Sequence, residues 1–145
     1  EWVRHGGYYP TWHLRLWRKE KGRYEEREVD EHVKLLEGKA GRLKRDFIDD
    51  NKKGIGAWIE KHNEYAEREA REVLKGNFQL STFNLQLYYR LPFFWRARLY
   101  YFYRLILRGG FLDSREGRLF HFLQAYWYRM LIDAKIYECK KQLPN

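Results

Sequence analysis

The sequence is poor in the residues that crosslink a chain or anchor it in a membrane. Cys139 is the only cysteine among 145 residues, which excludes an intramolecular disulfide and a cysteine zinc cluster. The longest uncharged run, from Gly76 to Tyr89, has 14 residues and contains Asn and Gln. A membrane-spanning helix needs about 20 apolar residues, so we expect no segment to cross a bilayer by itself.

The start of the chain also lacks the usual features of a natural N-terminus. It begins at Glu1, without a methionine or a signal peptide, and its first residues are already dense in aromatic and charged side chains. Natural N-termini are usually looser and more polar, so we expect further sequence upstream.

Positive charge and aromatic rings are concentrated in the second half. The net charge is +9, and residues from Gly76 onward hold 11 basic and 4 acidic residues and 18 of the 27 aromatic ones. Such a half suits an anionic surface, either lipid head groups or nucleic acid. Because we recognise no nucleic-acid-binding motif, we expect no nucleic acid among the partners.

Hydrophobic periodicity predicts strands first and helices later. Residues 12–17 alternate with the period of a strand, and residues 29–36 form a second candidate strand after a polar loop. A helix with one apolar face is predicted over residues 51–76. Two further helices are predicted over residues 94–108 and 116–140, separated by the Gly109-Gly110 pair.

Three acids and a histidine stand together in Glu28-Val29-Asp30-Glu31-His32. On a strand, Asp30 and His32 would share one face and Glu31 would point the other way. A carboxylate here can take a proton from an acceptor hydroxyl as a general base. The alternative is a solvated charge cluster.

Other candidate residues have equally plain alternatives. Arg15 suits a phosphate because its planar fork donates two parallel hydrogen bonds, or it lies on a surface strand. Asp46, Asp49 and Asp50 offer oxygen ligands for magnesium or manganese, or they cap the helix that follows. His121 lies in an apolar helical segment, and we expect a core histidine with one satisfied ring nitrogen.

The segment from residue 94 to 108 combines arginine with aromatic rings. On a helical wheel Arg96, Arg104 and Arg108 fall within about a third of the circumference. Trp95 and Tyr103 lie among them, and such rings favour the membrane–water interface. An in-plane membrane helix is therefore predicted. A core helix in a small bundle and a surface for base stacking are the alternatives.

Several motifs in a fixed order carry a resemblance. They are His5-Gly6-Gly7-Tyr8-Tyr9-Pro10, Leu14-Arg15-Leu16-Trp17-Arg18, Glu28-Val29-Asp30-Glu31-His32-Val33, Glu37-Gly38-Lys39-Ala40-Gly41-Arg42-Leu43, Lys61-His62-Asn63-Glu64-Tyr65, Gly109-Gly110-Phe111-Leu112-Asp113 and Phe120-His121-Phe122-Leu123-Gln124. The series resembles the C-terminal portion of bacterial family 2 glycosyltransferases, of the type that builds lipopolysaccharide core, capsule and exopolysaccharide. It covers nearly the whole chain.

The resemblance implies a GT-A fold, so we expect an α/β fragment. Residues 1–50 would be the C-terminal end of the catalytic domain, whose nucleotide-binding half would lie upstream. Residues 51–76 would be the amphipathic helix. Residues 77–145 would form a basic, aromatic, mostly helical region that associates with a membrane.

The resemblance also implies roles for individual residues. Glu31 would be the catalytic base, assisted by Asp30, which stands where relatives have a histidine. Arg15, Arg42 and His32 would bind substrate. Asp49 would help to hold the magnesium or manganese ion that such enzymes use.

The implied function is transfer of a sugar from a nucleotide-sugar donor to an envelope or exopolysaccharide glycan, with a lipid-linked acceptor expected. The enzyme would sit peripherally on the cytoplasmic face of the inner membrane, which presents an anionic surface. There Arg96, Arg104, Arg108, Trp95 and Tyr103 would contact the lipid. The alternative is a non-catalytic module that binds the membrane surface.

Overall fold

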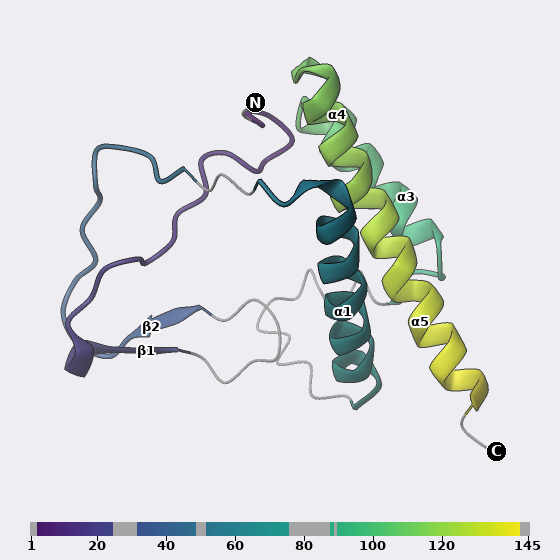
Figure 1. The fold of residues 1–145 in the computed structure, drawn as a ribbon, viewed down its shortest axis with the longest axis horizontal. Helices are drawn as coiled ribbons and strands as arrows, with labels where there is room; N and C mark the ends of the chain where they lie inside the picture. The colour runs from purple at the N-terminus through teal and green to yellow at the C-terminus, as the bar shows by residue number, and fades with distance from the viewer. Residues whose placement is uncertain (1–2, 25–31, 49–51, 76–87, 89, 143–145) are drawn as a thin grey trace. The chain divides into compact units, whose positions relative to one another are not determined.

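The computed structural model describes residues 3–24, 32–48, 52–75, 88 and 90–142, which form helices and one small sheet (Figure 1). The chain divides into two compact units. We call Glu1–Thr11 with His62–Asn145 the helical unit, and Trp12–Lys61 the inserted unit. The opening segment belongs to the helical unit because it bonds to residues more than 100 positions later. The predicted boundaries at residues 50 and 76 stay a prediction.

The inserted unit contains the sheet. After a 3-10 turn, η1 (Lys19–Lys21), strand β1 (Gly22–Tyr24) pairs antiparallel with β2 (Val33–Leu35), and Gly22 lies opposite Leu35. The strand predicted over residues 29–36 is confirmed for β2, while residues 29–31 lie outside the described part. The strand predicted over residues 12–17 is wrong. Both described strands pair only with each other, so this segment has no ladder to join.

Helix α1 (Gly54–Lys75) confirms the amphipathic helix predicted over residues 51–76. Its apolar face carries Ala66 and Ala70, four residues apart and both buried. These small side chains let α1 approach α5 (Tyr128–Gln142), where Ile132 and Ile136 are buried against them. Each isoleucine contributes roughly 1.5–3 kcal/mol by leaving water. This contact is the core of the helical unit.

The two later helices are also confirmed. The first runs through α3 (Trp95–Phe102) into a π-helical stretch, η2 (Tyr103–Leu107). The second runs through α4 (Arg115–His121), a π-helical stretch η4 (Phe122–Trp127) and α5. Between them Gly109, in the left-handed conformation, leads into a 3-10 turn, η3 (Gly110–Leu112). This turn delivers Asp113 to the interior of the helical unit.

The described part of the chain is thus mostly helical, with one two-stranded antiparallel sheet. Among the described residues, none of the helices has the length and apolarity that crossing a bilayer requires.

Candidate functional site

A buried carboxylate, Asp113, ties the opening segment to the late helices of the helical unit. The backbone N–H groups of Arg4 and His5 donate to its Oδ1 at 3.1 and 3.2 Å. Behind it, Ser114 begins α4 and accepts a hydrogen bond from the backbone N–H of Gly117 at 3.2 Å, as an N-cap does. Asp113 therefore directly precedes a capped helix and fixes the path of residues 4 and 5.

Two histidines bind the same carboxylate from opposite oxygens. His5 Nδ1 lies 2.7 Å from Oδ1, and His121 Nε2 lies 2.7 Å from Oδ2. His121 is fully buried, and its Nδ1 has no hydrogen-bond partner among the described residues. The prediction of a core histidine with one satisfied ring nitrogen is therefore confirmed.

The surroundings of Asp113 keep it ionised. Burial raises the pKa of its carboxyl, but hydrogen bonds from His5, His121 and the backbone of Arg4 and His5 outweigh burial and lower the pKa to about 2. A general base works best when its pKa lies near the working pH. Asp113 is thus too weak a base for proton transfer near neutrality, and its chemical role is to hold two imidazoles and a backbone segment in place.

Glycine makes this cluster possible. A Cβ at Gly6, whose φ is +70°, would stand 2.2 Å from Cε1 of His121. A Cβ at Gly110 would stand 2.9 Å from His121 Nε2, and one at Gly117 would stand 2.6 Å from Cβ of Asp113. Only residues without a side chain allow the backbone to come this close.

The cluster joins three of the motifs that carry the resemblance, those around His5, Asp113 and His121. The sequence presents these motifs in order, but it does not predict that they contact one another. The signal was present in the two Gly-Gly pairs, each close to a histidine or aspartate. Paired glycines often mark a close backbone approach.

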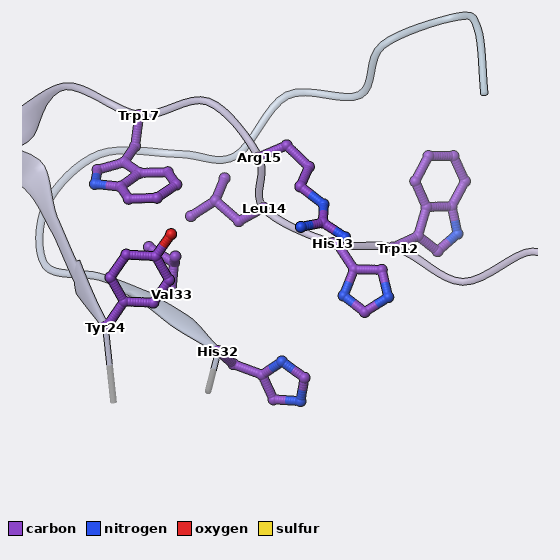
Figure 2. Close-up of a pocket in the computed structure, with 8 residues that line it drawn as sticks. All are labelled: Trp12, His13, Leu14, Arg15, Trp17, Tyr24, His32 and Val33. Atoms are coloured by element: carbon purple, nitrogen blue, oxygen red, sulfur yellow. The ribbon is translucent and has the colours of Figure 1, made fainter. Parts of the chain in front are cut away.

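The inserted unit contains a separate hollow of about 350 Å³. It is lined by Trp12, His13, Leu14, Arg15, Trp17, Tyr24, His32 and Val33. Figure 2 shows the rings of Trp17 and Tyr24 turned toward each other, and these rings meet edge to face with centroids 5.5 Å apart. Away from them His13 and His32 lie side by side, with ring centroids 6.1 Å apart (Figure 2).

Two of the three predicted substrate-binding residues meet at this hollow. Arg15 and His32 both line it, although 17 positions separate them in the sequence. Arg42 is not among the lining residues, but its guanidinium lies 4.6 Å from the ring centroid of Trp12, which is one of them. Arg15 lies 5.1 Å from the ring centroid of Phe47. Aromatic walls with a few cationic and imidazole groups can hold a polar ring and an attached phosphate.

The predicted catalytic and metal residues, Glu31, Asp30 and Asp49, lie outside the described residues. In the sequence Glu31 directly precedes His32. Across the ranges that the structure describes, no group of three or more histidine, cysteine, aspartate or glutamate side chains is arranged to hold a metal ion.

The five predicted membrane-surface residues separate into two groups. Trp95 and Tyr103 are exposed, by 56% and 42%, and Arg108 is exposed as well. Arg96 is only 2% exposed, so its prediction as a surface residue is wrong. Its guanidinium turns inward because it forms a buried ion pair with Asp133 of α5. Arg104 is half-buried, where its Nη1 donates to the carbonyl of Gly6 at 2.6 Å.

No family model, no curated protein and no solved structure matches the chain.

Proposed function

We propose that the chain provides the acceptor side of a glycosyltransferase, which moves a sugar from a nucleotide-sugar donor to an envelope or exopolysaccharide glycan carried on a lipid. The observation that supports this most directly is the hollow of the inserted unit. Arg15 and His32, chosen from sequence as substrate-binding residues, line it together with three aromatic rings. Glu31, the proposed base, directly precedes His32.

In the proposed reaction the acceptor hydroxyl attacks the anomeric carbon of the donor sugar. The bond between that carbon and the diphosphate breaks, and the nucleoside diphosphate leaves with the electron pair. Glu31 takes the hydroxyl proton as this happens. Arg15 offers its planar fork to phosphate oxygens, and His32 orients a sugar hydroxyl. The magnesium or manganese ion of such enzymes would accompany the donor diphosphate, and no described residue is assigned to it.

Substitution of the proposed base tests the proposal. Membranes from cells that express the protein are incubated with a panel of radiolabelled nucleotide sugars. The label transferred to the glycan fraction is then counted. We expect Glu31→Gln to reduce transfer about 100-fold or more, because general-base catalysis contributes 10²–10⁴-fold. Glu20→Gln, which neutralises an exposed carboxylate in η1, is the control and should retain full transfer. Full transfer by the Glu31 variant would remove Glu31 from this role.

A second candidate function, binding to the membrane surface, is favoured by an exposed apolar stripe. Trp95, Leu99, Phe102 and Ile106 recur at helical spacing along α3 and η2, and each is at least 44% exposed. The Arg98 guanidinium lies 5.3 Å from the ring centroid of Trp95. A stripe of this kind, edged by cations, suits an anionic bilayer surface such as the cytoplasmic face of the inner membrane.

Flotation with vesicles tests the membrane proposal. The double variant Leu99→Ser and Ile106→Ser should lose most binding to phosphatidylglycerol vesicles, because two apolar side chains of the stripe are removed. The matched control is Leu36→Ser with Leu43→Ser, which changes two exposed leucines of the inserted unit. Equal loss in both double variants, or no loss in either, would contradict a membrane contact through α3 and η2.

A further inference from the structure

Two arginines of the helical unit converge on the same glycine. A Cβ at Gly7 would stand 2.8 Å from Nη1 of Arg104, 3.0 Å from Nε of Arg108 and 3.2 Å from Nη2 of Arg108. Gly7 has a φ of +75° and no side chain, so the opening segment leaves room for both guanidinium groups. Arg104 lies in the π-helical stretch η2, and Arg108 follows its last residue, Leu107.

Neither arginine has a carboxylate partner within the part of the chain that the structure describes. Arg104 uses neutral acceptors, namely the carbonyl of Gly6 at 2.6 Å and the hydroxyl of Tyr100 at 2.6 and 2.9 Å. It also lies 4.3 Å from the ring centroid of Tyr8. The guanidinium of Arg108 has no hydrogen bond to any described residue. Two positive charges are therefore held close together without a counter-charge.

The neighbouring carboxylate is already engaged. Asp113, which lies just beyond the Gly109-Gly110 turn, binds His5 and His121 through its two oxygens. Arg118 donates to the backbone carbonyl of Asp113 at 3.1 Å. The positive charge of Arg104 and Arg108 beside Gly7 thus favours binding of an anion. The two guanidinium groups repel each other until an anion lies between them.

We infer that Arg104 and Arg108 form a binding site for a phosphate group beside Gly7. Arginine forks match phosphate oxygens, and Arg108 retains all of its donors for this purpose. Leu107 and Leu112, close by in the sequence, are 67% and 61% exposed. This apolar edge suits a phosphate carried on a lipid, and a soluble diphosphate presents the same oxygens. The inference deepens the proposed membrane contact by giving it a phosphate site.

The test compares two variants with the same change of charge. Arg108→Gln removes the free guanidinium, whereas Arg71→Gln removes an exposed arginine on α1 that forms a surface pair with Glu67. Circular dichroism first verifies that both variants are folded. Each protein is then titrated with inorganic pyrophosphate by calorimetry and floated with phosphatidylglycerol or phosphatidylcholine vesicles.

We expect Arg108→Gln to weaken pyrophosphate binding about tenfold and Arg71→Gln to change it less than about twofold. The same order with phosphatidylglycerol vesicles would identify a lipid phosphate as a ligand, and an effect on pyrophosphate alone would identify a soluble one. Equal effects of the two variants on both probes, or no binding of either probe by the unaltered protein, would overturn the site.

The double variant of the stripe separates this site from the apolar stripe. Leu99→Ser with Ile106→Ser should retain pyrophosphate binding within about twofold, because the arginines and the leucines beside them are unchanged. If the stripe fails its flotation test while Arg108→Gln still weakens pyrophosphate binding, the phosphate site stands without the membrane contact.

Discussion

Asp133 on α5 holds Arg96 of α3 inside the helical unit. Nε of Arg96 donates to Oδ1 of Asp133 at 2.6 Å, and the two side chains are 2% and 1% exposed. The other oxygen of Asp133 accepts a hydrogen bond from the backbone N–H of Phe94 at 2.8 Å. This carboxylate therefore fixes both the side chain of Arg96 and the start of the helix that carries it.

The first prediction concerns this buried pair. Asp133→Ala should lower the free energy of unfolding by about 3–5 kcal/mol, because it leaves the charge of Arg96 buried without its carboxylate. Urea unfolding followed by circular dichroism measures the change. Glu67→Ala, which breaks the exposed pair with Arg71, is the control and should cost under about 1 kcal/mol. A loss at Asp133 as small as the control's would contradict the buried pair.

The second prediction concerns the close approach at Gly6. Gly6→Ala should cost about 2–4 kcal/mol, because the new methyl group meets His121 and the left-handed backbone is strained as well. Gly38→Ala is the matched control. Its φ is +96°, but nothing lies within 4 Å of the added Cβ, so it should show the backbone cost alone, roughly 1 kcal/mol. Equal losses in the two variants would mean that position 6 does not contact His121.

The third prediction concerns the stability of the fold at low pH. The pKa of Asp113 is lowered from 3.8 to about 2, so the folded state favours its charged form. The resulting stability is complete above about pH 5 and is lost as the pH falls through 2. We expect a loss of roughly 1–2 kcal/mol from this group. Urea unfolding between pH 5 and 2 measures it, and Asp113→Asn should show a correspondingly shallower slope. Parallel slopes would contradict the pKa assignment.

The fourth prediction concerns the hydroxyl of Tyr8, which is buried and has no hydrogen-bond partner among the described residues. Tyr8→Phe keeps the ring against His121 and under Arg104, and it removes only the unsatisfied hydroxyl. We expect the free energy of unfolding at pH 7 to stay level or rise by up to about 1 kcal/mol. Tyr24→Phe, at an exposed position, is the control. A loss above about 1 kcal/mol would show that the hydroxyl has a partner.

Alkaline titration provides a second measurement on the same residue. Burial raises the pKa of Tyr8 to about 12, with a further rise from Tyr100 and partial opposition from Arg104 and Arg129. The stability gained from this neutral phenol is complete below pH 10 and is lost as the pH rises toward 12. Tyr8→Phe should therefore lose less stability than the unaltered protein between pH 10 and 12.

The sequence predicted the helices well because their signal is local. The apolar face of α1 and the Gly109-Gly110 break are visible within a few turns of chain, and the structure confirms both. The alternation in residues 12–17 is equally local, but a strand also needs a partner elsewhere in the chain. Trp17 meets the ring of Tyr24 instead, and the segment lines a hollow.

The candidate sites could be predicted only in part, for the same reason. Arg15 and His32 were selected by residue type, and the structure brings them to one hollow. Arg96 and Arg104 share a helical face with surface character in the sequence, but their directions depend on Asp133 and Gly6 on other segments. Charge pairs between distant segments leave no periodic pattern, so helical-wheel reasoning could not find them.

The bonds that Asp113 makes with the backbone of Arg4 and His5 close a loop of more than 100 residues. A ribosome adds about 5–20 residues per second, so the opening segment waits several seconds for the carboxylate that binds it. Meanwhile the inserted unit, whose two strands both lie between Gly22 and Leu35, can already form. The opening segment is thus made early but reaches its native contacts late. Its glycines do not have all of their native neighbours until Asp113 and His121 have been made.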